Sequence, residues 1–241
     1  MANEKDLYLR GIRIDWNKID PDSYLRRIDA LSGLTELGFH APVTFFVGEN
    51  GSGKSTLLEA IAVASGFNPE GGTRNYRFST YDSHSPLCDA VSLIRSVHLP
   101  RWGYFLCAES FYNVATAEEA YAKGPGGRPQ HYHERSHGES FLALAQENFR
   151  PGGLYLLDEP EAALSPQRQL ALLFEIAAYA GQHSQFVIAT HSPILLGMPG
   201  AEILSFDAGQ IHPCAYEDTD SYQVTRLFIN HREQVLRQLL E

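Results

Sequence analysis

The stretch that decides the fold is Gly48-Glu49-Asn50-Gly51-Ser52-Gly53-Lys54-Ser55-Thr56, in which two glycines with four residues between them precede Lys and Ser. When such a loop follows a strand and opens a helix, its backbone N–H groups turn toward a phosphate. The apolar run 43–47 predicts the strand, and residues 55–65 predict the helix. The stretch therefore predicts a phosphate-binding loop.

The side chains of this loop have the chemistry that a nucleoside triphosphate with Mg²⁺ requires. Lys54 would place a positive charge near the β- and γ-phosphates, and Ser55 would coordinate Mg²⁺, with Thr56 behind it on the helix. We assign nucleotide binding to Gly48, Glu49, Asn50, Gly51, Ser52, Gly53, Lys54, Ser55 and Thr56.

A second signal is the apolar strand 154–158, which ends in the adjacent carboxylates Asp158 and Glu159. Beside a phosphate loop, Asp158 would hold Mg²⁺, and Glu159 would orient or deprotonate the attacking water. The alternative is that these acids are capping charges of the following helix, a role we expect of Glu161.

Two shorter motifs add to this set. Ser136-His137-Gly138-Glu139-Ser140 precedes a predicted helix, and by itself Ser136 would be only a helix cap. Ala189-Thr190-His191-Ser192-Pro193 ends a predicted strand, where a lone His191 would ordinarily be structural.

Composition limits the classes of protein. The chain has 241 residues, is 44% hydrophobic and has a formal charge of −10, so its whole surface does not attract nucleic acid or anionic lipid. A local basic groove is still compatible with the residues Arg74, Arg77, Arg95 and Arg101. No apolar run is long enough for a membrane span or a secretory signal, so we expect a cytoplasmic protein. Cys88, Cys107 and Cys214 are widely spaced, as expected of ordinary buried thiols.

The order of elements predicts an α/β fold with a mainly parallel central sheet flanked by helices. Alternating apolar residues in 7–14 predict an N-terminal antiparallel β layer. We expect one domain, 1–241, with a small inserted lobe at about 66–135, and a mobile loop at 122–130. The remaining expected elements are helices at 88–97, 138–148 and 166–180, strands at 103–108, 154–158 and 185–190, and a docked C-terminal helix at 222–241, interrupted near Asn230.

Together, these motifs resemble the ATP-binding-cassette (ABC) superfamily of P-loop ATPases, especially its compact soluble SMC, RecF-like and OLD-like members. The order of phosphate loop, signature, acidic strand, D-loop and H-loop matches over nearly the full chain. The resemblance implies that Ser136 and Gly138 form the signature that closes over the nucleotide of a second subunit. It also implies that His191 contacts the γ-phosphate and that 162–165 is the D-loop at a dimer interface.

Some features depart from transporter subunits. The interval between Glu109 and Ser136 is short for the usual helical lobe, and the signature is Ser-His-Gly-Glu-Ser rather than Ser-Gly-Gly-Gln. Glu109 occupies the expected place of the Q-loop glutamine, where it would either reach Mg²⁺ or be a plain surface acid. The adenine-stacking candidates are Tyr8, Trp16 and Tyr24. The cluster of His131, His133 and His137 lacks the other ligands of a closed metal site and is interpreted as loop residues.

The resemblance implies a Mg²⁺-dependent ATPase that forms an ATP-dependent head-to-tail homodimer, with catalysis by Lys54, Glu159, His191 and Ser136. Its soluble relatives suggest a switch in DNA maintenance or phage defence that acts on DNA or a partner protein. The alternatives are an ATP-binding subunit of a transporter, or a nucleotide-gated interaction module with little turnover.

Overall fold

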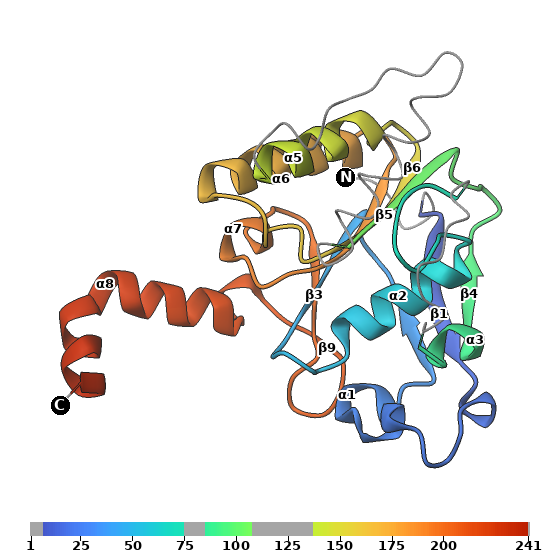
Figure 1. Cartoon of the computed structure of the whole chain (residues 1–241), viewed down its shortest axis with the longest axis horizontal. Helices are drawn as coiled ribbons and strands as arrows, with labels where there is room; N and C mark the ends of the chain where they lie inside the picture. The colour runs from blue at the N-terminus through green and yellow to red at the C-terminus, as the bar shows by residue number, and fades with distance from the viewer. Residues whose placement is uncertain (1–6, 75–84, 108–136, 241) are drawn as a thin grey trace.

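The structure, a computed structural model of the 241-residue chain, describes residues 7–74, 85–107 and 137–240. A six-stranded sheet crosses the body, helices cover both of its faces, and a three-stranded antiparallel sheet lies to one side (Figure 1). This arrangement confirms the expected α/β fold class. The expected loop at 122–130 and much of the expected lobe at 66–135 lie outside the described residues, so the domain boundaries stay a prediction.

The central sheet has the order β5-β6-β7-β3-β8-β9, in which the first five strands are parallel and β9 is antiparallel to β8. Its strands are β3 (Val43–Val47), β5 (Trp102–Cys107), β6 (Gly153–Asp158), β7 (Gln185–Ala189), β8 (Glu202–Ser205) and β9 (His212–Pro213). The strands expected at 43–47, 103–108, 154–158 and 185–190 are all present. Each boundary agrees within one residue.

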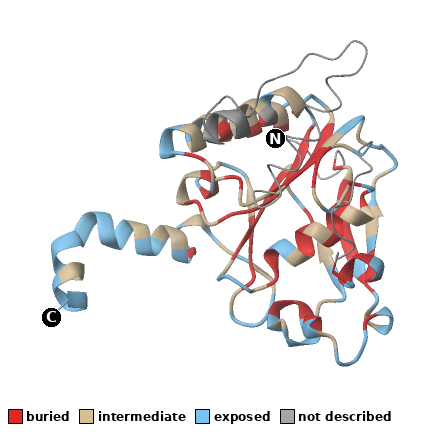
Figure 2. Cartoon of the chain, in the orientation of Figure 1, coloured by how far each residue is buried: buried red, intermediate tan, exposed pale blue. Residues whose placement is uncertain are grey.

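Apolar side chains fill the space on both faces of this sheet. Every residue of β3 and β7 is buried, as expected of parallel strands covered on both sides (Figure 2). Alternate side chains enter different cores: Phe46 packs with the first long helix, whereas Phe45 packs on the opposite face. The sheet therefore holds its carboxyl edge rigidly between two packed layers.

Helices were expected at 55–65, 138–148 and 166–180, and the structure contains all three. The α-helices are α1 (Asp29–Ser32), α2 (Lys54–Ala64), α3 (Leu87–Ala90), α5 (His137–Asn148), α6 (Pro166–Ala180), α7 (Pro193–Leu196) and α8 (Asp220–Leu240). The 3₁₀ helices are η2 (Trp16–Lys18), η3 (Tyr24–Arg27) and η5 (Tyr216–Asp218). The helices α5 and α6 lie together on one face of the sheet, and α2 lies on the other (Figure 1).

The expected antiparallel layer is the sheet β2-β1-β4, formed by β1 (Leu9–Ile14), β2 (Glu36–Gly38) and β4 (Val91–Arg95). Its third strand corrects our expectation, because a short helix was predicted at 88–97. Instead α3 ends at Ala90 and the chain continues as β4. A short run of aliphatic residues fits either element, and the free edge of β1 provides the hydrogen bonds that select the strand.

The side chain of Gln185 bridges the two sheets. Gln185, at the start of β7, accepts a hydrogen bond from the Leu9 N–H at 2.9 Å and donates its amide to the Leu9 carbonyl at 2.7 Å. Both residues are buried. The glutamine amide thus satisfies a backbone donor and acceptor of β1, as a neighbouring strand would.

The C-terminal helix also differs from expectation. It begins at Asp220 and projects away from the body, and most of it is exposed (Figures 1 and 2). Its apolar positions had suggested docking, but the spacing of apolar residues says nothing about what covers them. The backbone leaves helical geometry at His231, close to the interruption expected near Asn230. Within the described residues, no helix, α8 included, has the length and apolar content needed to span a membrane.

Candidate functional site

The phosphate loop connects β3 to α2 in a conformation that only glycine adopts without strain at several positions. Gly48, Gly51 and Gly53 have φ values of 142°, 82° and 98°. A Cβ at Gly53 would lie 2.8 Å from the Ile28 side chain and 2.9 Å from that of Leu31. The loop is therefore packed against the segment around α1 as well as turned toward the carboxyl edge of the sheet.

Lys54 is 4% exposed and bends back over the loop. Its Nζ donates to the carbonyls of Gly48 at 2.7 Å and Glu49 at 2.8 Å. Burial lowers the pKa of the Lys54 ammonium, and nearby carboxylates, Glu159 foremost, oppose that shift. Because the carboxylates offset only part of the cost of burying the positive charge, an anionic ligand beside Lys54 would raise the pKa of its ammonium group.

Ser55 and Asp158 meet as the sequence predicts. The Ser55 hydroxyl donates to Oδ1 of Asp158 at 2.9 Å, because the carboxyl ends of β3 and β6 lie at one edge of the sheet. On the other side of Asp158, Cys107 at the end of β5 lies 3.9 Å from Oδ2. Cys107 is only half-buried, so it differs from the ordinary buried thiol that we expected.

Glu159 follows Asp158 in a strained conformation, with φ of 47°, which is unusual for a residue with a side chain. Its N–H donates to the Ala189 carbonyl of β7 at 2.9 Å, and this bond fixes the turn. Glu159 lines a cavity of about 160 Å³ together with Ser55, Thr56 and Asp158. The two adjacent acids thus face the first turn of α2.

Glu161 has a different role from the one we expected. It does not cap α6, whose N-cap residue Ser165 makes no side-chain cap bond. Instead its Oε1 accepts the N–H of His191 at 2.6 Å, which joins the segment after β6 to the segment after β7. The second oxygen of Glu161 and Nε2 of His191 are buried, and neither has a hydrogen-bond partner within the described parts of the chain. Sequence reasoning missed this contact because the two residues are 30 positions apart.

A further network supports the histidine segment. Ser192 caps α7 and donates its hydroxyl to Oε1 of Gln169 at 2.6 Å. The Gln169 amide in turn donates to the Leu164 carbonyl at 3.0 Å. The expected D-loop is therefore connected to the residue after His191 by side-chain hydrogen bonds.

Asp207 is a second residue that sequence reasoning missed. It follows β8, and its Oδ1 accepts the N–H of Glu49 at 3.0 Å. It also accepts a bond from the Ser205 hydroxyl at 3.2 Å. Asp207 thus anchors the phosphate loop from the end of β8, which pairs with β3 on the side opposite β7. This contact could have been predicted only from the order of strands in the sheet.

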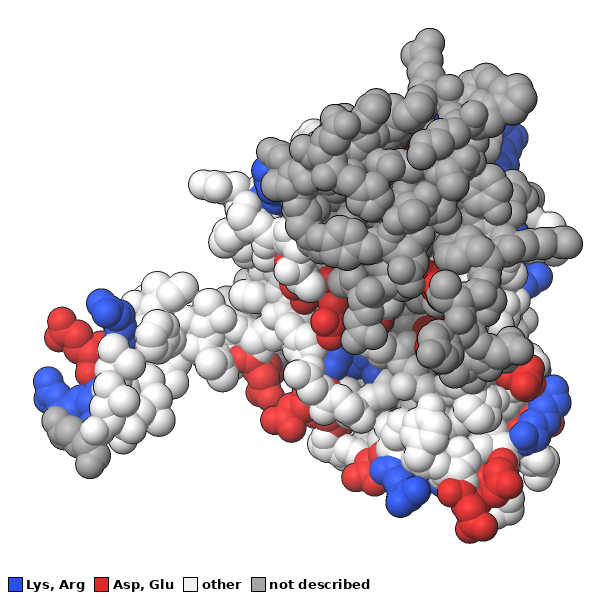
Figure 3. Space-filling view, viewed as in Figure 1, with Lys and Arg blue, Asp and Glu red and all other residues white. Residues whose placement is uncertain are grey.

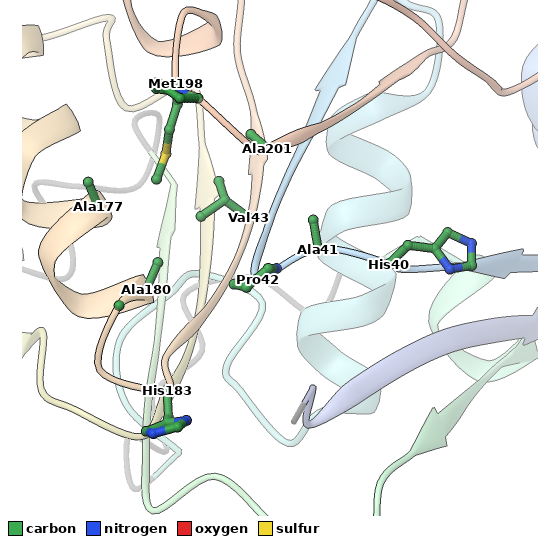
Figure 4. Close-up of a pocket in the computed structure, with 12 residues that line it drawn as sticks. His40, Ala41, Pro42, Val43, Ala177, Ala180, His183, Met198 and Ala201 are labelled. Atoms are coloured by element: carbon green, nitrogen blue, oxygen red, sulfur yellow. The ribbon is translucent and has the colours of Figure 1, made fainter. Parts of the chain in front are cut away.

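Several cavities lie among the described residues, and two of them adjoin the phosphate loop. A cavity of about 580 Å³ extends from Gly48 and His191 to the first turns of α8. Acidic side chains gather beside the base of α8 (Figure 3). A cavity of about 750 Å³ lies instead at the amino ends of the strands, where His40, His183 and mainly small apolar residues line it (Figure 4). It contains none of the predicted site residues.

Other predicted residues are not brought to the site. Trp16 is covered by the guanidinium of Arg26, 5.4 Å from its ring centroid, and donates to the Leu34 carbonyl. Tyr24 is half-exposed and bonds to Ser85. Neither they nor Tyr8 line the two cavities beside the loop. The residues Glu109, His131, His133 and Ser136 lie outside the described chain. Gly138 and His137 lie in the first turn of α5, where the structure describes the backbone alone.

Family models match two separate parts of the chain. Residues 25–89, which include the phosphate loop, match an AAA domain. Residues 125–197, which include both acids and the histidine, match a model described as "AAA domain, putative AbiEii toxin, Type IV TA system". Both models describe AAA domains, so these two parts of the chain resemble AAA-type P-loop ATPases. No curated protein matches it.

Solved structures similar to this chain include the SMC head domain from Thermotoga maritima. That structure is 16% identical, with 87% of this chain and 99% of that chain covered and a TM-score of 0.46. Another is cbiO1 from Clostridium perfringens, part of the ABC transporter complex cbiONQ. It is 12% identical, with 94% and 96% covered and a TM-score of 0.48. At these values we draw no functional conclusion from either likeness.

The residues at this edge of the sheet fit a nucleotide with its metal ion. Members of the AAA families whose models match generally hydrolyse ATP, usually with Mg²⁺. The Ser55 hydroxyl and the Asp158 carboxylate are the oxygen ligands that Mg²⁺ prefers. Within residues 7–74, 85–107 and 137–240, the buried hydroxyl of Ser52 and Nε2 of His191 have no partner, and both can donate to phosphate oxygens.

Proposed function

We propose that the chain binds ATP with Mg²⁺ at the P-loop and hydrolyses it to ADP and phosphate. The supporting observation is the meeting of three strand ends at one edge of the sheet. Lys54 and Ser55 follow β3, the two acids end β6, and His191 follows β7. No simpler role accounts for a buried lysine, paired acids and a histidine whose buried Nε2 has no partner among the described residues, all at one edge of the sheet.

In this proposal each residue has a distinct role. Lys54 and the loop N–H groups stabilise charge on the phosphates. Ser55 and Asp158 hold Mg²⁺, which neutralises charge on phosphate oxygens when bound. Glu159 orients or deprotonates the attacking water, and His191 donates to the γ-phosphate. Glu161 is a positioning residue, because it holds the backbone of His191 rather than a reacting atom.

We further propose that two copies close head to tail over two nucleotides. Ser136 and Gly138 of the second copy would then complete each site, and 162–165 would lie at the interface. The bonds that join Leu164 through Gln169 to Ser192 support this, because closure at the D-loop would reach the histidine segment directly. Hydrolysis would reopen the pair.

The output of this cycle is proposed to be a switch in DNA maintenance or phage defence. The family model over residues 125–197, whose description names a toxin of a toxin–antitoxin system, supports the defence role. A pull-down with the ATP-trapped variant described next would identify the partner. A permease in that pull-down would instead indicate a transporter subunit.

The substitution Glu159→Gln tests the dimer. It removes the proposed base but keeps the size of the side chain, so the variant should bind Mg·ATP and accumulate as a dimer. Light scattering coupled to size exclusion measures the mass with and without Mg·ATP. Lys54→Ala is the control, which should stay monomeric in both conditions. A Glu159→Gln variant that binds ATP but stays monomeric would refute the head-to-tail model.

Turnover needs a separate measurement. Phosphate release from Mg·ATP should be measurable for the parent chain and at least about 100-fold slower for Glu159→Gln, the scale expected on loss of a general base. Equal, negligible release from the parent, Glu159→Gln and Lys54→Ala would instead indicate a nucleotide-gated module without catalysis.

A further inference from the structure

A second pocket lies at the opposite end of α2 from the P-loop. Helix α2 has 11 residues and is therefore about 16 Å long, so the two ends are well separated. The pocket has a volume of about 90 Å³ and lies between β1, β4 and the end of α2. Its polar lining includes Ser65, Arg74 and Arg95, and its apolar lining includes Leu9, Leu93 and Leu99.

The two guanidinium groups are held in place without a negative partner. Arg95 donates to the Ala64 carbonyl at the end of α2, at 2.9 Å. Arg74 stacks over the Phe67 ring, 5.2 Å from its centroid. Burial and the neighbouring charge of Arg95 lower the pKa of Arg74. Within the described chain neither arginine forms an ion pair, whereas Arg13 on the same sheet pairs with Glu36.

Ser65 adds a buried hydroxyl group to the lining that Arg74 and Arg95 provide. The residue is 7% exposed, and its buried hydroxyl has no hydrogen-bond partner among the residues that the structure describes. A buried, unpartnered hydroxyl is unfavourable, and proteins rarely retain one without an acceptor nearby. Since two positive groups line the same pocket, the missing acceptor has the chemistry of an anion.

A phosphate group suits this lining better than other anions. It has several acceptor oxygens around one centre, so it can accept from donors on three different segments. Arginine presents N–H groups in a planar fork that matches such oxygens in pairs. The negative end of the α2 dipole would oppose an anion here, but Arg95 already donates to the terminal carbonyl.

We propose that this pocket binds a phosphate group, from a nucleic-acid strand or from a free phosphorylated molecule, between Arg74, Arg95 and Ser65. The site is distinct from the P-loop and does not depend on the proposed ATPase activity. It would give a chain with a net charge of −10 a local point of attachment that the whole surface does not provide.

Binding is measured in the Lys54→Ala background, so that the P-loop does not contribute. The probes are inorganic phosphate, followed by NMR of the arginine Nε–H groups, and a fluorescein-labelled single-stranded oligonucleotide, followed by anisotropy at low salt. Arg74→Ala should weaken binding about tenfold, the loss expected for a charged hydrogen bond. Arg13→Ala removes the same charge from β1, outside the pocket, and should change binding less than about twofold.

Ser65→Ala separates binding from folding. It removes an unpartnered hydroxyl, so the melting temperature should stay the same or rise, while affinity for the probe falls severalfold. Saturable phosphate binding alone would assign the site to a free phosphate or a small phosphorylated molecule. Oligonucleotide binding that both substitutions weaken would assign it to a nucleic-acid strand. If neither probe binds saturably, or if Arg74→Ala and Ser65→Ala behave like Arg13→Ala, the proposal is overturned.

Discussion

At the residue scale, the P-loop glycines differ in what surrounds them. Gly51 and Gly53 both have φ values in the left-handed region. A Cβ at Gly51 would meet nothing within 4 Å, whereas one at Gly53 would overlap Ile28 and Leu31. The pattern of glycines in the sequence does not distinguish these positions, because it shows the loop but not the segment that packs against it.

This contrast predicts different costs for the same substitution. Gly51→Ala should lower the free energy of unfolding by about 1 kcal/mol, the cost of the backbone conformation alone. Gly53→Ala should cost about 3 kcal/mol, because overpacking adds to that strain. Urea denaturation measures both, and a fluorescent ATP analogue should bind much more weakly to Gly53→Ala. Equal losses of stability would show that α1 can move away from the loop.

At the element scale, α8 shows how far a pattern can be trusted. The apolar spacing of 222–241 correctly predicted a helix, and its break lies at His231. Its large apolar side chains, including Leu227 and Leu239, are nevertheless exposed. At β4 the pattern predicted a helix where the structure has a strand, because hydrogen bonding to the free edge of β1 selected the strand. Local sequence thus indicates the apolar positions of a segment, but it does not indicate which other segments pack on it or pair with it.

Removing most of α8 should therefore leave the body intact. A chain ending at Arg226 keeps Tyr222, whose ring packs on Tyr216 at 4.7 Å between centroids. Its melting temperature should lie within about 2 °C of the full chain, since the deleted residues bury little apolar surface. Differential scanning calorimetry tests this. A drop of about 5 °C or more would mean that α8 packs on the body in solution.

At the scale of the whole molecule, the contacts that sequence reasoning missed join distant segments. The predicted order of strands and helices placed Lys54, Asp158 and His191 at one edge of the sheet, and the structure does so. The contacts of Glu161 and Asp207 could not be foreseen, because each depends on which strand ends are neighbours. Their roles, like those of the predicted site residues, stay predictions until variants are measured.

At this scale, substitution of Gln185 tests how strongly its hydrogen bonds to Leu9 hold the two sheets together. Gln185→Leu keeps the size of the side chain but leaves the N–H and carbonyl of Leu9 without partners. It should lower the free energy of unfolding by about 2–4 kcal/mol. Gln182→Leu is the matched control, because Gln182 is exposed and makes one local bond, and it should cost less than about 0.5 kcal/mol. Similar urea midpoints for the two variants would show that the sheets are held together elsewhere.

The position of β3 between β7 and β8 has a consequence for synthesis on the ribosome. The P-loop and its strand emerge early, but both hydrogen-bonding neighbours of β3 come from residues 185–205. Until those residues leave the exit tunnel, the apolar segment Val43–Val47 has no strand to pair with and is open to intermolecular pairing. A nascent chain stalled before β7 should therefore be sensitive to protease and bind chaperones, and it should acquire nucleotide binding only after β8 is released.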